Sequence, residues 1–463
     1  MTLSPGNTET TETSLARDSV GTTLTYALLF FLGLLIFVLN CRILGPLWRG
    51  MLGLIMIAPA LVLKIGNFGY DQGMVVIGSR ERYLLRSLTW TGLLYSFTLG
   101  MLAIGILMGF MWGFPIQFWR VFQGVWNPVA FSVISLVFPI HLMTQVVDAA
   151  IYAEDRISVR NRKEVIVNAV MLLIIIVLWR AFGLKLMAIV GAHVIANFVS
   201  LVYGWFLAKD RIGTPVGFDR VLVDKSVRLG FPVSLAYLAG YLMLPAMIIP
   251  LSLAMGGSPI ENLERLGFFS VAFMMVDRIL PVTRSVAFAL LPKITIGTDA
   301  EAGELTAKAS RHTLIISLFV FIFLVIFMKP IIVFLIGQRF LNVVFPFAIM
   351  APGGIALSVS GVWAAHLLAR KRPLDVAYAG IVGVVIALLC SGLGFYYLPH
   401  GREVLVASMS VVVGNLVAFA IMLPAFCKSG HLTVRDALLP TSDDFREWKR
   451  IPGFIFDMIR RKR

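Results

Sequence analysis

The chain has 463 residues, of which 59% are hydrophobic and only 14% are charged, and its mean hydropathy is +0.88. Soluble domains carry about 25% charged residues, so a soluble fold is excluded and a polytopic membrane protein is predicted. The net charge of +15 does not indicate nucleic acid as a partner, because the positive-inside bias of membrane proteins accounts for it. Cys41, Cys390 and Cys427 show no metal or redox spacing, so neither a metal site nor a disulfide framework is expected.

The first 20 residues form a polar segment that is rich in Thr and Ser, and its charged residues are Glu9, Glu12, Arg17 and Asp18. A cleaved signal peptide needs a basic start, a shorter apolar core and a small-residue cleavage site. Residues 1–20 are therefore predicted to be a short, disordered N-terminal tail.

The rest of the chain is predicted to cross a membrane about twelve times, because apolar runs long enough to span a bilayer recur along it. Six spans fill residues 21–207, near Gly21–Asn40, Gly50–Ile77, Leu88–Trp112, Trp126–Tyr152, Glu164–Phe182 and Leu184–Leu207. Six more fill residues 229–427, near Leu229–Met255, Leu266–Pro292, Thr313–Ile336, Leu341–Leu368, Leu374–Leu398 and Val404–Phe426. A polar linker at residues 208–228 separates the two groups.

A basic tail, residues 428–463, ends the chain. After Trp448 it alternates cations with bulky apolar side chains. This pattern is typical of an amphipathic segment, such as an interfacial helix, that lies on an anionic inner leaflet. The alternative is that the basic tail only fixes the membrane topology. Membrane lipids are therefore expected partners of this segment.

Basic residues are distributed unequally between alternate loops. Of the 40 Lys and Arg residues, 28 fall in the tails and in the loops on their side, nine fall in the opposite loops, and Lys64, Arg278 and Arg284 fall within spans. Cytoplasmic loops carry the excess of Lys and Arg, so both termini are expected in the cytoplasm. The opposite loops are all short and no nucleotide-binding motif is present, so we expect no enzymatic activity and no cofactor.

The two groups of six spans resemble each other weakly. The second span opens on Leu44-Gly45 and the eighth on Leu266-Gly267, and each continues as a long apolar run with charge inside it. Transporters built from such repeats bind their cargo between the halves. The predicted fold is an all-α integral membrane protein, with about twelve transmembrane helices in two pseudo-symmetric six-helix bundles around a central cavity.

Polar side chains inside the second and eighth spans are predicted to line that cavity. Lys64, Asn67 and Asp71 fall on one stripe of a continuous helix. A cation near the middle of a span is costly unless it faces protein or water. The residues expected to receive an anionic cargo are Lys64, Asn67, Arg278 and Arg284. The alternative is local ion pairing, of Lys64 with Asp71 and of Arg284 with Asp277.

Three carboxylates within spans are candidates for coupling transport to a proton or a sodium ion: Asp71, Asp148 and Asp277. Asp148 shares a polar helix face with His141 and Gln145, which must face protein or water. The alternative is that Asp148 pairs with Arg156 near the cytoplasmic end of its span.

Two further cations, Arg42 and Arg49, flank the turn after the first span. With the N-terminus inside, this turn lies at the periplasmic mouth. There the two guanidinium groups are candidates for attracting phosphate during release, and ordinary contact with lipid headgroups is the alternative.

Three short motifs resemble one family. The segments Arg42-Ile-Leu-Gly-Pro46, Arg49-Gly50 and Gly66-Asn-Phe-Gly69 are similar to the first-loop pattern of bacterial polysaccharide-biosynthesis flippases. Lys329-Pro-Ile-Ile-Val-Phe-Leu-Ile-Gly-Gln-Arg339 resembles the outer end of that family's ninth span, and Ala365-His-Leu-Leu-Ala-Arg-Lys-Arg372 the end of its tenth. These flippases, which include those for O-antigen, belong to the multidrug/oligosaccharidyl-lipid/polysaccharide (MOP) exporter superfamily.

The resemblance implies a flippase of the bacterial inner membrane. Such a protein moves undecaprenyl-pyrophosphate-linked oligosaccharide repeat units to the periplasmic leaflet by alternating access, for exopolysaccharide, capsule or O-antigen synthesis. A polysaccharide polymerase or a chain-length regulator is then an expected partner. The alternatives are a multidrug or lipid II exporter of the same superfamily, a membrane glycosyltransferase or polymerase that acts on lipid-linked glycans, and a non-transporting scaffold.

Overall fold

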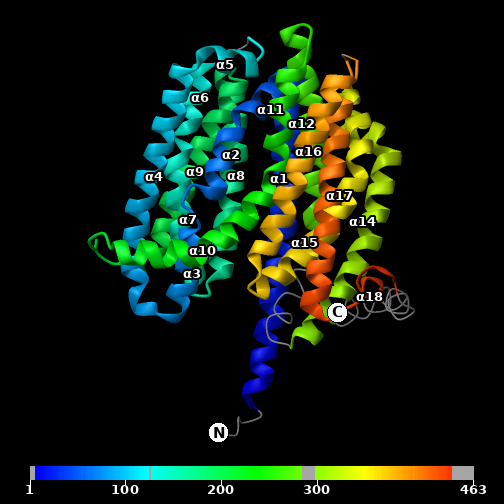
Figure 1. The fold of residues 1–463 in the computed structure, drawn as a ribbon. Coiled ribbons are helices and arrows are strands. Elements are labelled where there is room, and N and C mark those ends of the chain that lie inside the picture. The colour runs from blue at the N-terminus through cyan, green and yellow to red at the C-terminus, as the bar shows by residue number, and fades with distance from the viewer. Residues whose placement is uncertain (1–5, 125–126, 284–297, 400, 441–463) are drawn as a thin grey trace, which may run out of the picture.

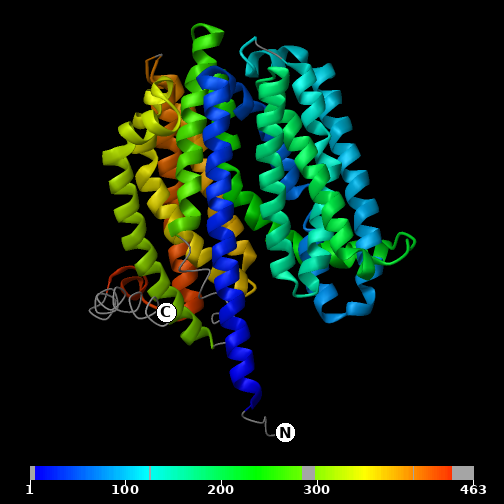
Figure 2. The ribbon, with the colours of Figure 1, turned by 180° about the vertical axis from the view of Figure 1, so that it is seen from behind.

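The computed structural model describes residues 6–124, 127–283, 298–399 and 401–440, and every regular element in these ranges is helical. The helices stand in two bundles side by side, with α1 running along the seam between them (Figures 1 and 2). The first bundle and the seam contain α1 (Gly6–Ile55), α2 (Ile57–Ile65), α3 (Tyr70–Arg80), η1 (Arg82–Leu84), α4 (Leu85–Gly113), α5 (Pro115–Val121), α6 (Pro128–Ser135), α7 (Val137–Ala153), α8 (Ile157–Phe182) and α9 (Leu186–Ile212). The remaining elements are α10 (Arg220–Tyr241), α11 (Met243–Ala254), α12 (Pro259–Thr283), α14 (Asp299–Leu335), η2 (Gln338–Val343), α15 (Val344–Ala369), α16 (Pro373–Tyr397), α17 (Glu403–Gly430) and α18 (Val434–Leu438).

Within the described residues, nine helical runs are long and apolar enough to cross a membrane, and the bent pair α10–α11 makes a tenth. The first run, Ala27–Arg80, turns back at Gly45, where a φ of 66° interrupts the helix before Pro46. With this reversal and with α12, each of the twelve spans expected from the sequence overlaps a helical segment, and residues 284–292 of the eighth span lie outside the described residues. The protein is therefore an all-α, multi-pass membrane protein, as predicted.

We call the side where α1 begins and α17 ends the inner side, and the opposite side the outer side (Figure 1). The chain rises along α1 to the outer side and returns through α2 and α3 (Figures 1 and 2). The turn after α5 and the turn between α11 and α12 both lie at the outer side.

Two predicted non-helical segments are largely helical. Residues 6–20 of the expected disordered tail continue α1 as helix, because adding residues to an existing helix needs no new nucleus. The expected linker at residues 208–228 shrinks to residues 213–219, where the side chain of Asp219 caps α10 by accepting a hydrogen bond from Val221 N at 2.8 Å. The basic segment after Trp448 lies outside the described residues.

Helices α1 and α12 cross at van der Waals distance through two glycines, Gly50 and Gly267. A Cβ added to Gly50 would lie 1.9 Å from Leu263 O, and one added to Gly267 would lie 2.1 Å from Pro46 O. Both neighbours are backbone atoms, which cannot move aside as a flexible side chain can. Small residues allow this kind of close helix packing in membranes, and here they fix the start of the second span against α12.

We predict that Gly267→Ala destabilises the protein by about 1–3 kcal/mol, the usual cost of overpacking, because the new methyl group must push the Pro46 carbonyl away. The measurement is the melting temperature of the purified protein in detergent. Gly109→Ala in α4 is the matched control, because a Cβ there meets nothing within 4 Å. Equal melting temperatures for the two variants would contradict the proposed crossing.

Candidate functional site

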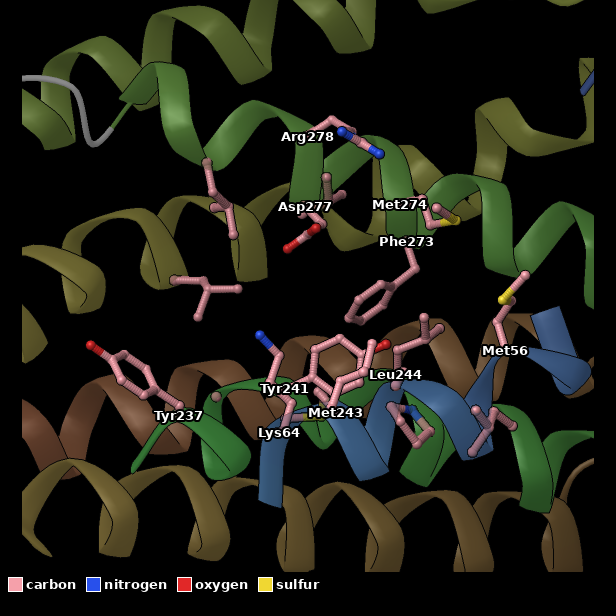
Figure 3. A pocket seen from close by; sticks show the side chains of 18 of the residues that line it. Met56, Lys64, Tyr237, Tyr241, Met243, Leu244, Phe273, Met274, Asp277 and Arg278 are labelled. Atoms are coloured by element: carbon pink, nitrogen blue, oxygen red, sulfur yellow. The ribbon is translucent and has the colours of Figure 1, made fainter. Parts of the chain in front are cut away.

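A cavity of about 910 Å³ lies between the two bundles. Its walls come from α1 and α2, from α6 to α9 of the first bundle, and from α10, α11, α12, α15, α16 and α17. It extends toward the inner side, where Leu368 near the end of α15 and Val376 near the start of α16 line it. Figure 3 shows Lys64 of α2 and Asp277 of α12 pointing into this space from opposite walls, with Tyr241 beside Lys64.

The position of Lys64 depends on a break between α2 and α3. Phe68 and Gly69 adopt positive φ values of 51° and 80°, which end the helix. Lys64 thus lies in the last turn of α2, where the helix dipole favours a positive charge. Its ammonium group lies 5.5 Å from the ring centroid of Tyr241, a cation–π contact across the cavity wall.

Side chains from two neighbouring helices satisfy the carbonyls that this break exposes. Gln145 Nε2 of α7 donates to Leu63 O at 2.7 Å, and Ser234 Oγ of α10 donates to Lys64 O at 2.9 Å. In hydrocarbon an unsatisfied carbonyl costs several kcal/mol. The break is therefore stable only because α7 and α10 supply these donors.

Asn67 and Asp71 do not line the cavity, in contrast to the prediction from the sequence. Asn67 is buried, and its Nδ2 donates to Gln145 Oε1 at 2.9 Å, so its role is to hold the break. The carboxylate of Asp71 accepts a hydrogen bond from Gln72 at 2.8 Å. The predicted stripe assumed a continuous helix, whereas the chain turns between these positions, and no ion pair joins Lys64 to Asp71 in the described structure.

The eighth span places Asp277 and Arg278 at the cavity, as lining residues. Arg278 packs against α1 at Gly33, where an added Cβ would lie 2.5 Å from Arg278 Nη1. A side chain at this point of α1 would displace the guanidinium group of Arg278. Arg284 lies outside the described residues.

Arg49 lies deep in the cavity wall and not at an exposed mouth, which corrects the prediction. Its side chain is 4% exposed, donates to Met274 Sδ and lies 5.8 Å from the Phe37 ring centroid. Arg49 Nε and the nearby Asn40 Oδ1 are buried without a hydrogen-bond partner, and both residues line the cavity. Sequence spacing missed this site, because only the reversal at Gly45 folds Arg49 back against α1.

Arg42 remains exposed, close to the outer end of α14. Its guanidinium donates to Leu335 O at 2.7 Å and to Phe334 O at 2.6 Å. These carbonyls belong to the last turn of α14, where the helix itself provides no donors. Arg42 therefore caps a helix, and it does not line the cavity.

Asp148 is paired inside the first bundle, away from the cavity lining. Its carboxylate is bonded to the ammonium of Lys163, which is fully buried, and Arg160 lies 4.0 Å away. The predicted partner, Arg156, instead contacts Glu154 at 3.5 Å. A paired, buried carboxylate gives this part of the bundle a structural ion pair.

The cavity lining combines positive charge with apolar and aromatic surface. Its charged residues in the described ranges are Arg49, Lys64, Asp277 and Arg278. Amide and ring groups complete the polar part: Asn40, Asn168, His193, Asn197, Tyr237, Tyr241 and Asn415. No group of three or more His, Cys, Asp or Glu side chains that could hold a metal ion occurs in the described ranges. This arrangement suits an anionic group attached to a larger amphipathic molecule.

No protein-family model matches this sequence, and no curated protein is significantly similar to it. Solved structures do share its fold. A lipid II flippase MurJ, in an inward closed conformation, is similar with a TM-score of 0.69 and 13% identity over 90% of this chain and 88% of that chain. An inward-facing multidrug resistance MATE family transporter of the MOP superfamily has a TM-score of 0.66 and 13% identity over 86% of this chain and 94% of that chain.

An MOP superfamily transporter from Pyrococcus furiosus is also similar, with a TM-score of 0.57 and 14% identity over 89% of this chain and 94% of that chain. Its structure was described as having a binding pocket of reversed polarity. The chain therefore has the fold of MOP superfamily transporters, and these neighbours are transporters and flippases, not enzymes.

We predict that Gln145→Leu destabilises the protein by about 1–3 kcal/mol, because Leu63 O and Asn67 Nδ2 lose their partner inside the membrane. The melting temperature in detergent measures the loss. Gln117→Leu is the control, because Gln117 lies exposed on α5. A Gln145→Leu protein as stable as the control would mean that the break between α2 and α3 holds without this side chain.

Proposed function

We propose that the protein is a flippase that moves a lipid-linked oligosaccharide, carried on a polyprenyl pyrophosphate, from the inner to the outer leaflet by alternating access. The supporting observation is the group of three cations, Arg49, Lys64 and Arg278, on the wall of one cavity. None of the three forms an ion pair with a described residue. A bound pyrophosphate would supply the missing negative charge.

The orphaned nitrogen of Arg49 strengthens this proposal. A buried polar atom without a partner typically costs 1–3 kcal/mol, and more in a charged group. Such a cost persists in a protein when the group has a partner at another stage of its function. A phosphate oxygen would satisfy Arg49 Nε through a charge-assisted hydrogen bond, which is about twice as strong as a neutral one.

The remainder of the lining suits the sugar part of the cargo. Asn40 and Asn415 offer amide groups that both donate and accept hydrogen bonds, as sugar hydroxyls require. The cavity of about 910 Å³ has room for a headgroup of a few sugars but not for a long polyprenyl chain. The lipid tail therefore stays in the bilayer while the headgroup crosses.

The charge of the lining also argues against the alternative cargo of a multidrug exporter. An organic cation would face three positive groups, with Asp277 as the opposing carboxylate in the described part of the wall. Like charges at close range disfavour binding strongly when water is scarce. Lipid II, which also carries a pyrophosphate, remains the nearest competing cargo on these grounds.

The orientation follows from the loops. The inner side carries most of the basic residues outside the spans, so we assign it to the cytoplasm of a bacterial cell and the membrane to the inner membrane. Asp277 is the carboxylate that faces the cavity in Figure 3, and it is our choice for the site where a proton or sodium ion couples to transport. A polymerase or chain-length regulator would receive the flipped repeat unit.

The prediction concerns binding of undecaprenyl pyrophosphate to the purified protein in lipid nanodiscs. We expect Lys64→Met and Arg278→Met each to weaken binding at least about tenfold, because a cation–phosphate contact is typically worth 1.5–3 kcal/mol. In cells, both variants should abolish polymer export while they still insert at normal levels. Lys64→Arg should retain most binding.

Arg228→Met is the matched control, because Arg228 is 79% exposed on α10 and pairs with Asp224 at 2.9 Å. Wild-type affinity in both cavity variants would refute the proposal. Binding of an organic cation, with no binding of the pyrophosphate, would instead assign the cavity to a drug exporter.

A further inference from the structure

The loop that follows α5 ties the first bundle to the second at the outer side. Ser252 Oγ of α11 donates to Val121 O at 2.5 Å, and Gln123 Nε2 donates to Ser252 O. Asn262 Nδ2 of α12 donates to Gln123 Oε1 at 3.0 Å. The amide of Gln123 therefore uses both its ends to join α11 and α12.

The two partners of Gln123 in this contact are buried, although they lie at the end of the bundles. Ser252 is fully buried and Asn262 is 1% exposed. Gln123 itself adopts a φ of 52°, in the left-handed region that a residue with a side chain rarely enters. This conformation ends α5, where Gln123 N donates to Arg120 O at 3.1 Å and Gly124 N donates to Trp119 O at 2.9 Å.

The aromatic residue before Gln123 anchors the loop to its own bundle. Phe122 is 3% exposed and packs edge-to-face on Phe131 of α6, with ring centroids 4.8 Å apart. In this loop, Phe122 is thus packed in the first bundle, while the amide of the next residue, Gln123, is hydrogen-bonded to the second bundle. Any separation of the bundles at the outer side must break the bonds of Gln123 while Phe122 stays in place.

We propose that Gln123, with Ser252 and Asn262, is the latch that keeps the outer side of the cavity closed while the inner side receives cargo. The inference rests on the proposed transport function only in that it requires the outer side to open at some stage. The hydrogen bonds of Gln123 with Ser252 and Asn262 are then the ones that break when the outer side opens. None of these three residues lines the cavity.

The inner side carries a different kind of contact, which supports an asymmetric cycle. There Lys225 of α10 pairs with Glu81 at 3.1 Å, and the two side chains are 48% and 36% exposed. The Lys225 ammonium lowers the pKa of the Glu81 carboxyl through a hydrogen bond. An exposed ion pair exchanges readily with water and is screened by salt, whereas the partly buried amide of Gln123 bonds to Ser252 and Asn262, which are both buried.

The test measures access to the cavity from the outer side. In a protein with Cys41, Cys390 and Cys427 replaced by Ala, Met56→Cys serves as the reporter, because Met56 lines the cavity. A membrane-impermeant maleimide is applied to intact cells. We expect Gln123→Leu to speed labelling by about five- to thirtyfold, the population shift expected when one or two hydrogen bonds of the closed state are lost.

Two further variants make the test specific. Gln123→Glu keeps the acceptor for Asn262 but cannot donate to Ser252 O, so its labelling rate should lie between wild type and Gln123→Leu. Gln117→Leu on α5 is exposed and should label at the wild-type rate. Unchanged labelling in a Gln123→Leu protein that retains its melting temperature would overturn the latch.

A second experiment asks whether the latch must open. Gln123→Cys and Asn262→Cys, combined in the same cysteine-free protein without the reporter, are joined by a short bismaleimide. The cross-linked protein should lose transport, while the uncross-linked double variant retains it; full transport after cross-linking would overturn the proposal. The labelling experiment needs no cargo, so a failure of pyrophosphate binding would not affect its result. Unchanged labelling in Gln123→Leu would equally leave the pyrophosphate-binding result unaffected.

Discussion

The structure depends on one constraint: inside a bilayer each backbone carbonyl and each charge needs a partner from the protein or from trapped water. At the break between α2 and α3, Gln145 and Ser234 are these partners, because they donate to the carbonyls of Leu63 and Lys64. The same break ends α2 at Lys64 and turns its ammonium group into the cavity. The break after α2, which α7 and α10 stabilise by hydrogen bonds, thereby positions the Lys64 ammonium group inside the protein.

The same constraint separates cations that are paired within the protein from those that we propose to bind cargo. Arg42 is saturated by carbonyls at the end of α14, and Lys163 is neutralised by Asp148 inside the first bundle. Among the described residues, Arg49 Nε has no hydrogen-bond partner, and the Lys64 ammonium group contacts the ring of Tyr241 and faces the cavity. All four are cations in or beside spans, so sequence position alone does not distinguish them. The structure distinguishes them by the groups that each one contacts.

The sequence predicts the helices well because length and hydropathy decide whether a segment can span a membrane. It fails where a few glycines change the path of the chain. The stripe through Lys64, Asn67 and Asp71 required a continuous helix, and the positive φ of Gly69 removes it. Arg49 was assigned to a mouth because the reversal at Gly45 leaves no sign in the sequence of how far the chain folds back. The pairing of Asn67 with Gln145, 78 residues away, is equally invisible before the bundle is assembled.

A carrier must hold its cargo firmly enough to extract it from one leaflet and loosely enough to release it into the other. A site of strong, fully satisfied ion pairs would not bind an anion, and a site of bare cations would not release one. Here the cations lie on a largely apolar wall, with Asp277 facing Lys64 across the cavity. If the cargo is the pyrophosphate that we propose, this carboxylate lowers the positive potential that remains in the cavity after release, which favours release of the cargo. On that proposal, the balance of charge matters more for transport than the number of cations does.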